Sequence, residues 1–193
     1  MKIVSKKEAI AKLKVGDPII FQTDTLPAIG CLPQYWEVIY KVKKRDRGKA
    51  LILMGSELCQ VIEYVAQPAR NDVRKISKKY WPGPLTLVVP LSDSAKLKFS
   101  SSDNTLGIRV PNSYVAQSLI RDVGPLATSS ANISGILTST NAESVARDLP
   151  EIDLLGPLPW QECSGKASTI ISWCAKGKWN LLRNGEVSIT NFE

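Results

Sequence analysis

Dense groups of hydroxyl, amide and cationic side chains stand beside short apolar runs at several places in this sequence. The densest is at 124–135, where an apolar run gives way to a polar cluster, namely Thr128, Ser129, Ser130, Asn132 and Ser134. In open α/β sheets ligands bind outside the carboxyl ends of strands, which is where such a loop would lie. The cluster therefore predicts a binding site, with a turn whose Ser and Asn side chains cap their own backbone as the alternative.

Two further polar clusters stand next to predicted strands. The segment 22–30 follows the apolar run 18–21 and contains Thr23, Asp24 and Thr25 before it closes on a glycine. The segment 43–49 carries five cations in seven positions and precedes the apolar run 50–54. Each has a simpler interpretation, because Asp24 could cap a backbone amide and a basic run suits the end of a helix. Held between a helix and the sheet, the cations would instead face a polyphosphate.

Two arginines belong to predicted strands. Arg109 interrupts the apolar run 106–110, and Arg183 ends the run 179–183. A guanidinium in an apolar run requires an anion or a carbonyl oxygen as its partner. For Arg109 a structural ion pair is the alternative to a ligand contact. Together with Ser168 and Thr169, the two arginines enlarge the set of polar groups that are predicted to converge.

Histidine is absent from the 193 residues, which excludes His-based triads, His general bases and His metal sites. The groups that remain suit phosphoryl or nucleotidyl transfer, where positioning and charge neutralisation supply most of the rate. The net charge of +7 favours anionic partners such as phosphates or RNA. Neither G-x-x-x-x-G-K-S/T nor G-x-G-x-x-G occurs, so a Walker-type ATPase and a Rossmann enzyme are excluded.

Helices and strands alternate through the first 150 residues and predict the scaffold of this site. The patterns indicate helices over 5–15, 33–43, 56–66, 68–80, 112–123 and 140–149, and strands over 18–21, 50–54, 85–90, 106–110 and 124–127. Ser5, Asn112 and Thr140 are the predicted N-caps of three helices. A hairpin of 168–173 and 179–183 closes the chain. We expect one α/β domain over 1–193, a twisted sheet of mixed parallel and antiparallel strands flanked by helices.

The cellular compartment is predicted from what the sequence lacks. No apolar stretch reaches the length of a membrane span, and the charged N-terminus does not match a secretory signal, so we expect a cytoplasmic protein with no membrane partner. The four cysteines form no C-x-x-C pair and are predicted to be buried free thiols rather than disulfides or zinc ligands. The polar segment 92–104 is predicted to be a loop that could act as a lid.

The polar clusters lie in an order and spacing that resembles the YrdC and Sua5 family of threonylcarbamoyl-AMP synthases along nearly the whole chain. The matching segments are Thr23-Asp24-Thr25 with Gly30, Lys43-x-Arg45 with Lys49-Ala50-Leu51, Trp81-Pro82-Gly83-Pro84-Leu85-Thr86, Ile108-Arg109-Val110-Pro111, Ser129-Ser130-Ala131-Asn132-Ile133-Ser134-Gly135, and Ser168-Thr169 with Arg183-x-Gly185. Each segment alone is a weak signal, whereas the set in this order is highly specific.

The resemblance implies a YrdC-like fold and an enzyme that joins L-threonine, bicarbonate and ATP into threonylcarbamoyl-AMP and pyrophosphate. This is the first step toward N6-threonylcarbamoyladenosine at position 37 of certain tRNAs. The residues that the resemblance assigns to catalysis and to the nucleotide and phosphate site are Lys43, Arg45, Ser130 and Asn132. The further nucleotide contacts are Arg109, Ser168 and Arg183, and Thr23 borders the threonine pocket. No protein ligand for a metal is predicted, and Mg²⁺ is expected to act with ATP.

Three positions depart from the family's usual residues and define the alternative. Leu26-Pro27-Ala28 replaces a Val-Tyr-Gly pattern, Asp46 replaces a proline, and Ser113 replaces a histidine. The alternative is a YciO-like paralogue that keeps the fold and binds RNA or nucleotide without making the adenylate. Beyond the substrates, the expected partners are tRNA, other proteins of the same modification pathway and double-stranded RNA.

Overall fold

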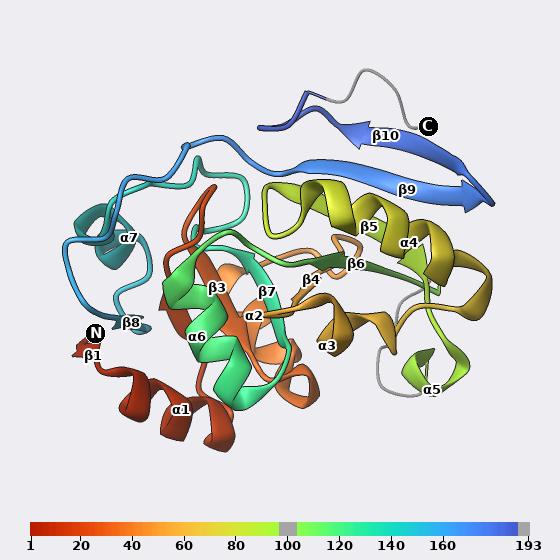
Figure 1. Ribbon diagram of the computed structural model, residues 1–193. Helices are drawn as coiled ribbons and strands as arrows, with labels where there is room; N and C mark the ends of the chain where they lie inside the picture. The colour runs from red at the N-terminus through yellow and green to blue at the C-terminus, as the bar shows by residue number, and fades with distance from the viewer. Residues whose placement is uncertain (97–103, 189–193) are drawn as a thin grey trace.

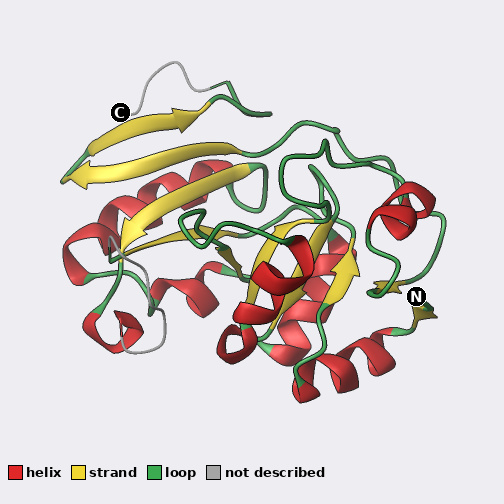
Figure 2. Cartoon of the chain, turned by 180° about the vertical axis from the view of Figure 1, so that it is seen from behind, coloured by secondary structure: helices red, strands yellow, loops and turns green. Residues whose placement is uncertain are grey.

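The computed structural model describes residues 1–96 and 104–188 and shows one ten-stranded sheet with helices on both faces (Figures 1 and 2). The strands are β1 (Ile3–Val4), β2 (Ile19–Phe21), β3 (Ala28–Cys31), β4 (Ile52–Met54), β5 (Leu85–Pro90), β6 (Thr105–Arg109), β7 (Leu126–Ser130), β8 (Asp153–Leu155), β9 (Thr169–Ala175) and β10 (Lys178–Arg183). The α-helices are α1 (Lys6–Val15), α2 (Glu37–Lys43), α3 (Leu58–Ile62), α4 (Gln67–Tyr80), α5 (Asp93–Lys96), α6 (Tyr114–Val123) and α7 (Ala142–Asp148), and a 3₁₀ turn spans Pro33–Tyr35.

The strands lie in the order β1-β8-β2-β3-β7-β4-β6-β5-β9-β10. Four neighbouring pairs are parallel, namely β1 with β8, β2 with β8, β4 with β6 and β5 with β9, and the others are antiparallel. The predicted fold class, an α/β domain with a mixed sheet flanked by helices, is therefore confirmed. The predicted hairpin is confirmed as the antiparallel pair of β9 and β10.

Alternate residues of the central strands are buried against opposite faces of the sheet. In β2, Ile19 and Phe21 join a cluster with α1 and α6, whereas Ile20 joins a cluster with α2 and α7. In β7, Leu126 faces the first cluster and Ala127 the second. Because both faces are covered, these strands read in the sequence as continuous apolar runs rather than as alternating patterns. A third cluster lies between α3, α4 and strands β4, β5, β6 and β9.

Of the three predicted N-caps, one is confirmed and two are corrected. Ser5 caps α1 in a complete capping box with Glu8, as predicted. The N-cap of α6 is Ser113 rather than Asn112, because the Ser113 hydroxyl accepts a hydrogen bond from the backbone of Ala116. Likewise α7 is capped by Asn141 rather than Thr140, since the Asn141 side chain accepts from the backbone of Ser144. Neighbouring polar residues at a helix start are equally good caps on sequence alone.

Three short strands have no counterpart in the prediction. These are β1, β3 and β8, of two, four and three residues. The segment 28–31 was predicted to belong to a polar loop, but it turns back antiparallel to β2 and pairs with β7 on its other side. Short strands take their stability from their neighbours in the sheet, so the local pattern does not reveal them.

The cysteine prediction is partly wrong. All four cysteines are free, as predicted, but only Cys31 is buried, whereas Cys59 and Cys174 are exposed. Burial raises the pKa of the Cys31 thiol to about 12. Within the described ranges, no helix has the length and apolar character that a membrane span needs. The predicted lid over 92–104 includes α5, but its residues 97–103 lie outside the described part of the chain.

Candidate functional site

A cavity of about 260 Å³ lies on the sheet face that also packs against α1 and α6. Its floor is formed by side chains from β3, β7, β4 and β6, which are neighbours in the sheet. Its polar lining includes Thr25, Arg45, Arg109, Thr128, Ser129, Ser130, Thr138, Ser168 and Arg183, and no acidic side chain of residues 1–96 and 104–188 lines it. Three guanidinium groups, of which Arg109 alone is paired with a carboxylate, are the kind of lining that can hold an anion.

The sequence predicts a site outside the carboxyl ends of the strands, and this position is wrong. The cavity lies over the face of the sheet instead. The reason is the direction of β7, which runs antiparallel to β4 while β6 runs parallel to it. Ser130 at the end of β7 therefore lies at the opposite edge from Met54 and Arg109, which end β4 and β6. The polar groups after strands do converge, but over the middle of the sheet.

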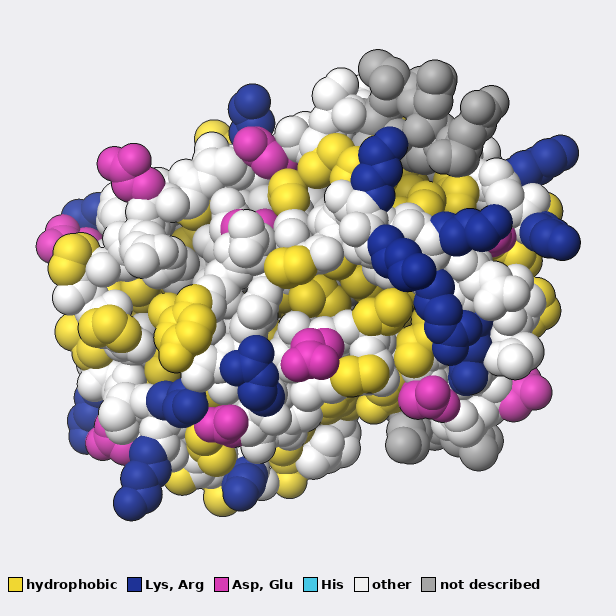
Figure 3. Space-filling view, viewed as in Figure 1, with side chains coloured by type: hydrophobic (Ala, Val, Ile, Leu, Met, Phe, Trp, Pro, Cys, Tyr) yellow, Lys and Arg dark blue, Asp and Glu magenta, His cyan; other side chains and the backbone are white. Residues whose placement is uncertain are grey.

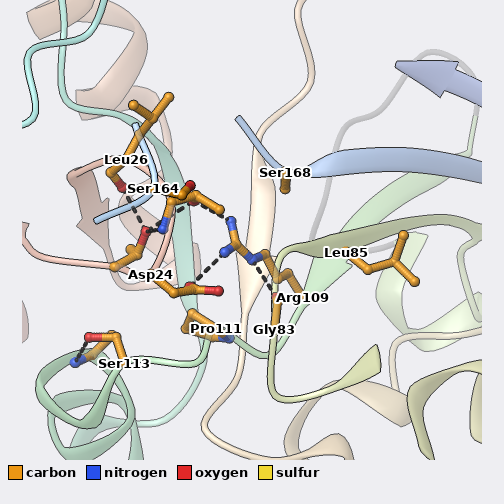
Figure 4. Close-up of polar contacts among 12 residues, drawn as sticks. Asp24, Leu26, Gly83, Leu85, Arg109, Pro111, Ser113, Ser164 and Ser168 are labelled. Carbon is orange, nitrogen blue, oxygen red and sulfur yellow. Dashed lines mark hydrogen bonds and ion pairs between the residues drawn. The ribbon is translucent and has the colours of Figure 1, made fainter. Parts of the chain in front are cut away.

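Arg109 lies at the buried base of the cavity and is only 2% exposed. Its Nη2 donates to Oδ1 of Asp24 at 2.6 Å, its Nη1 donates to the Thr25 hydroxyl at 2.9 Å, and its Nε donates to the Gly83 carbonyl at 3.0 Å (Figure 4). Burial lowers the pKa of Arg109, and the charge of Asp24 opposes that shift. Arg109 thus forms the structural ion pair that was one interpretation of its sequence position, and it also lines the cavity.

Lys43 occupies a different position from Arg45, although the two are neighbours in one motif. The Lys43 side chain is 1% exposed and does not line the cavity. Its ammonium donates to the carbonyls of Ser130 and Asn132 and to the Asn132 side-chain oxygen. An ammonium group has three N–H donors, so these three acceptors use all of them. Lys43 therefore fixes the loop that follows β7 from behind the cavity wall.

Arg45 and Arg183 line the cavity from opposite ends of the chain. Arg45 donates to the carbonyls of Lys49 and Ala50 at 3.1 and 2.9 Å, which folds the basic loop back on itself. Arg183, the last residue of β10, donates to the Ser168 carbonyl at 3.0 and 2.8 Å. Burial lowers the pKa of both guanidinium groups. In each case the backbone holds the cation at the cavity.

Of the eight residues predicted for the site, five line this cavity and three do not. The five are Arg45, Arg109, Ser130, Ser168 and Arg183. Asn132 is buried behind the wall, where its Oδ1 accepts from the Ser130 hydroxyl at 2.6 Å. Thr23 is also buried, and its hydroxyl donates to the Leu26 carbonyl at 2.7 Å. Lys43, Asn132 and Thr23 are thus placed to support residues that line the cavity.

The structure adds two residues to the candidate site. Asp24 is predicted as part of a polar cluster, with a backbone cap as the alternative, whereas in the structure it is the ion-pair partner of Arg109. Its Oδ2 is buried and accepts no hydrogen bond from the residues that the structure describes. Thr138 also lines the cavity, from a segment whose sequence carries no pattern that would have revealed it.

The three departures from the family pattern have different positions. Leu26 and Ala28 line the cavity, so they change its wall. Asp46 is exposed, and its carboxylate accepts from the backbone of Gly48 at 2.9 Å. Ser113 caps α6, and its hydroxyl donates to the Gln22 carbonyl. Asp46 nevertheless lies near enough to Arg45 for its charge to raise the pKa of that guanidinium, against the effect of burial.

The stability of the protein should depend on pH through Lys43. Burial, and to a smaller extent Arg45, lower the pKa of Lys43 from 10.5 to about 7. Between these values the unfolded chain binds more protons than the folded one, so the free energy of unfolding should rise with pH across that window. We expect the wild type to gain stability between pH 7 and 9.5 relative to Lys43→Met, measured by urea unfolding. A difference that stays constant with pH would show that Lys43 keeps an ordinary pKa.

Comparison with known proteins shows which family this chain resembles. The family model Sua5/YciO/YrdC, described as "Telomere recombination", matches residues 11–185. The chain is 33% identical over 192 residues to a protein of Bacillus subtilis strain 168 named "Threonylcarbamoyl-AMP synthase", and the match covers 96% of this chain and 55% of that protein. It is 30% identical to a Bos taurus protein of the same name, over 93% of this chain and 67% of the relative. The chain thus spans little more than half the length of the Bacillus relative.

Solved structures give the same result. A structure described as P. abyssi Sua5 complexed with L-threonine superposes with a TM-score of 0.84 at 28% identity, over 96% of this chain and 58% of the other. The structure of E. coli YciO superposes with a TM-score of 0.82 at 22% identity, over 97% of this chain and 92% of the other, and shares the fold. The matched residues include every element around the cavity, and the chain therefore belongs to the Sua5/YciO/YrdC family.

Proposed function

We propose that this chain makes threonylcarbamoyl-AMP from L-threonine, bicarbonate and ATP. The observation that carries the proposal is the cavity itself, where the chain brings together Arg45, Arg109, Ser130, Ser168 and Arg183. These five come from separate segments of the motif set, and the chain is 33% identical to a Bacillus subtilis protein named for this activity. A wall of three arginines and two serines suits a substrate that carries several phosphates.

The proposed chemistry needs charge neutralisation more than it needs a protein base. The threonine amine joins the carbon of bicarbonate, water leaves, and the resulting carbamate oxygen attacks the α-phosphorus of ATP. The bond from the α-phosphorus to the bridging oxygen breaks, and pyrophosphate departs with the electron pair. Negative charge grows on that leaving group, so fixed guanidinium groups lower the barrier. A chain without histidine can supply this catalysis.

The proposed roles follow the positions of the residues. Arg45 and Ser130 bind the phosphates directly from the cavity wall, whereas Lys43 and Asn132 act by holding Ser130 and its loop. The further nucleotide contacts are Arg109, Ser168 and Arg183. Thr23 shapes the threonine pocket through its hydrogen bond to Leu26, which itself lines the cavity.

Mg²⁺ is proposed to accompany the nucleotide. The residues that line the cavity include no carboxylate, and in the described part of the chain no three His, Cys, Asp or Glu side chains gather as metal ligands. Triphosphate oxygens and water are the ligands that Mg²⁺ commonly keeps in nucleotide sites. The donor set therefore fits an ion that is bound by ATP and not held by the protein.

The product is proposed to serve the modification of adenosine 37 in tRNA, with other proteins carrying out the transfer. The free cysteines fit the reducing cytoplasm, where we place the reaction. The YciO-like alternative rests on one observation, that Leu26 and Ala28 replace family residues in the cavity wall. It predicts nucleotide binding without adenylate formation.

An omission series tests the proposal. The purified protein is incubated with ATP, Mg²⁺, L-threonine and bicarbonate, and pyrophosphate release is followed while each component is left out in turn. We expect release that requires both threonine and bicarbonate. ATP binding by calorimetry without any release that depends on threonine would favour the YciO-like alternative.

A further inference from the structure

A second cavity lies between the start of α7 and the segment 158–163, and it is larger than the first. Its volume is about 930 Å³, and it shares no lining residue with the cavity of about 260 Å³. Most of its lining residues are exposed, among them Asn141, Pro159 and Gln161, so it is an open groove. A small molecule is commonly enclosed by its site, whereas an open groove suits a segment of another chain. We call this cavity the α7 groove.

The apolar lining of the α7 groove includes the ring of Trp160, which is fixed in place. Its indole N–H donates to the Leu155 carbonyl at 3.0 Å, and the half-buried ring packs against the core cluster that contains Val145 of α7. Leu158 packs against the same cluster and also lines the groove. A rigid aromatic ring offers a large contact area at a low cost in conformational entropy, and tryptophan is enriched among the residues that dominate protein interfaces.

The charge of the α7 groove is opposite to that of the whole chain, which carries +7. Glu143 and Glu162 are exposed on its lining, and in the described ranges no cation lies within 4.0 Å of either carboxylate. Arg147 also lines the groove, but its Nη2 donates to the Ser144 hydroxyl at 2.8 Å. Two carboxylates and one guanidinium leave the groove negative. Figure 3 shows a band of Lys and Arg side chains instead over α4 and the β9–β10 hairpin, which Figure 1 places at the other end of the molecule from α7.

The α7 groove and the smaller cavity are separated by two segments of the chain. In the first segment, Thr138 lines the cavity and Thr140 lines the groove. The second segment continues from 158–163 to Gly165, whose backbone N–H donates to the carbonyl of Thr25 at 3.1 Å. Thr25 itself lines the cavity. A partner held in the groove therefore lies next to the cavity without entering it.

We propose that the α7 groove binds a segment of a partner protein that presents a lysine or arginine beside an aliphatic side chain. The cation pairs with Glu143 and Glu162 and lies against the Trp160 ring, where a cation–π contact adds to the ion pairs. The aliphatic side chain packs on Leu158. A nucleic acid is disfavoured, because the two carboxylates repel phosphate groups. This docking goes beyond the synthase reaction and needs neither ATP nor threonine.

Selection from a peptide library tests the proposal. Phage that display short random peptides are selected on the immobilised full chain, without ATP or threonine, and the enriched peptides are synthesised with a fluorescent label. We expect peptides in which a lysine or arginine stands next to leucine, isoleucine or valine. Enrichment of acidic peptides alone, or no enrichment, would overturn the proposal.

Fluorescence anisotropy with the labelled peptides then assigns the binding to the α7 groove. Glu143→Gln with Glu162→Gln should lower the affinity about fivefold to tenfold, the scale for two exposed ion pairs. Trp160→Ala should lower it about thirtyfold or more, as expected for an aromatic residue that dominates an interface. The matched control is Glu57→Gln with Glu63→Gln, which makes the same change in net charge on exposed positions outside the groove and should stay within about twofold of wild type.

Equal losses in the two double variants would assign the binding to net charge and overturn the proposal. Light scattering of the free protein tests whether a second copy of this chain occupies the groove, and dimers that separate in the Glu143 and Glu162 variant would also overturn it. Urea unfolding identifies any variant that fails to fold, and Trp160→Phe, which keeps an aromatic ring, should bind more tightly than Trp160→Ala. Threonine-dependent pyrophosphate release is expected to be unchanged in the Glu143 and Glu162 variant, so a failure of docking is distinguishable from a failure of the synthase reaction.

Discussion

Arg109→Met is expected to lower the free energy of unfolding by about 3–5 kcal/mol, the scale for removing one member of a buried ion pair. Arg109 is almost fully buried, and its partner Asp24 is also largely inaccessible, with 14% of its side chain exposed. Removing the guanidinium leaves a carboxylate with no opposite charge. It also removes the donor to the Gly83 carbonyl and one of the two side-chain partners of the Thr25 hydroxyl, which keeps its hydrogen bond with Thr23. The measurement is equilibrium unfolding in urea at pH 7.

A double variant removes the Asp24 carboxylate that Arg109→Met leaves without an opposite charge. In the double variant Asp24→Asn with Arg109→Met, the buried carboxylate is gone, and part of the lost stability should return. Single replacement of Asp24 by Asn should cost less than replacement of Arg109, because the guanidinium keeps two other acceptors. A loss below about 1 kcal/mol for Arg109→Met would contradict the buried pair.

Arg45→Ala is expected to lower kcat/KM for threonylcarbamoyl-AMP formation by about 10²–10³-fold, which is the effect of losing one positioned electrostatic partner. The guanidinium lines the cavity, and its hydrogen bonds to the carbonyls of Lys49 and Ala50 hold it there. The same bonds connect parts of one surface loop, so their loss should cost only about 1–2 kcal/mol of stability. The variant should stay folded while turnover is lost. Initial rates at varied ATP and threonine provide the measurement.

Arg47→Ala is the matched control for this prediction. Arg47 lies two residues away in the same basic loop, but it is exposed, and its Nη1 lies 3.7 Å from the Glu37 carboxylate. Exposed ion pairs of this kind contribute little, so turnover should remain within about twofold of wild type. Equal losses in the two variants would mean that the loop acts through its total charge. Wild-type turnover in Arg45→Ala would show that Arg45 takes no part in the reaction.

The long elements of the fold were predictable because local signals and tertiary packing agree in them. The capping box at Ser5, the apolar periodicity of α6 and the apolar run of β5 each indicate one structure, and the chain adopts it. The segment 28–31 was not predictable in this way. Its residues are few, and they become a strand because β2 and β7 supply hydrogen bonds on both sides. That information lies in distant parts of the chain.

The sequence predicted which residues line the cavity better than it predicted how their side chains are arranged. The cation of Arg109 inside an apolar run required a partner, but nothing local identifies Asp24, which lies 85 residues away. Lys43 and Arg45 carry similar charges within one motif, yet one is buried and holds a loop while the other faces the cavity. Lys44, which stands between them, ends α2 in a left-handed conformation with φ 48°, so the chain turns and the two side chains point in different directions. A sequence motif does not record direction.

The most direct measurement follows the carbon atom of bicarbonate. The purified protein is incubated with ATP, Mg²⁺, L-threonine and ¹³C-bicarbonate, alongside Arg45→Ala and Arg47→Ala, and the products are analysed by mass spectrometry. The expected result is threonylcarbamoyl-AMP that carries the heavy carbon in the wild type and in Arg47→Ala, and a large loss of this product in Arg45→Ala. Bound ATP with no labelled adenylate at any threonine concentration would contradict it and would leave this cavity a nucleotide-binding site without synthase activity.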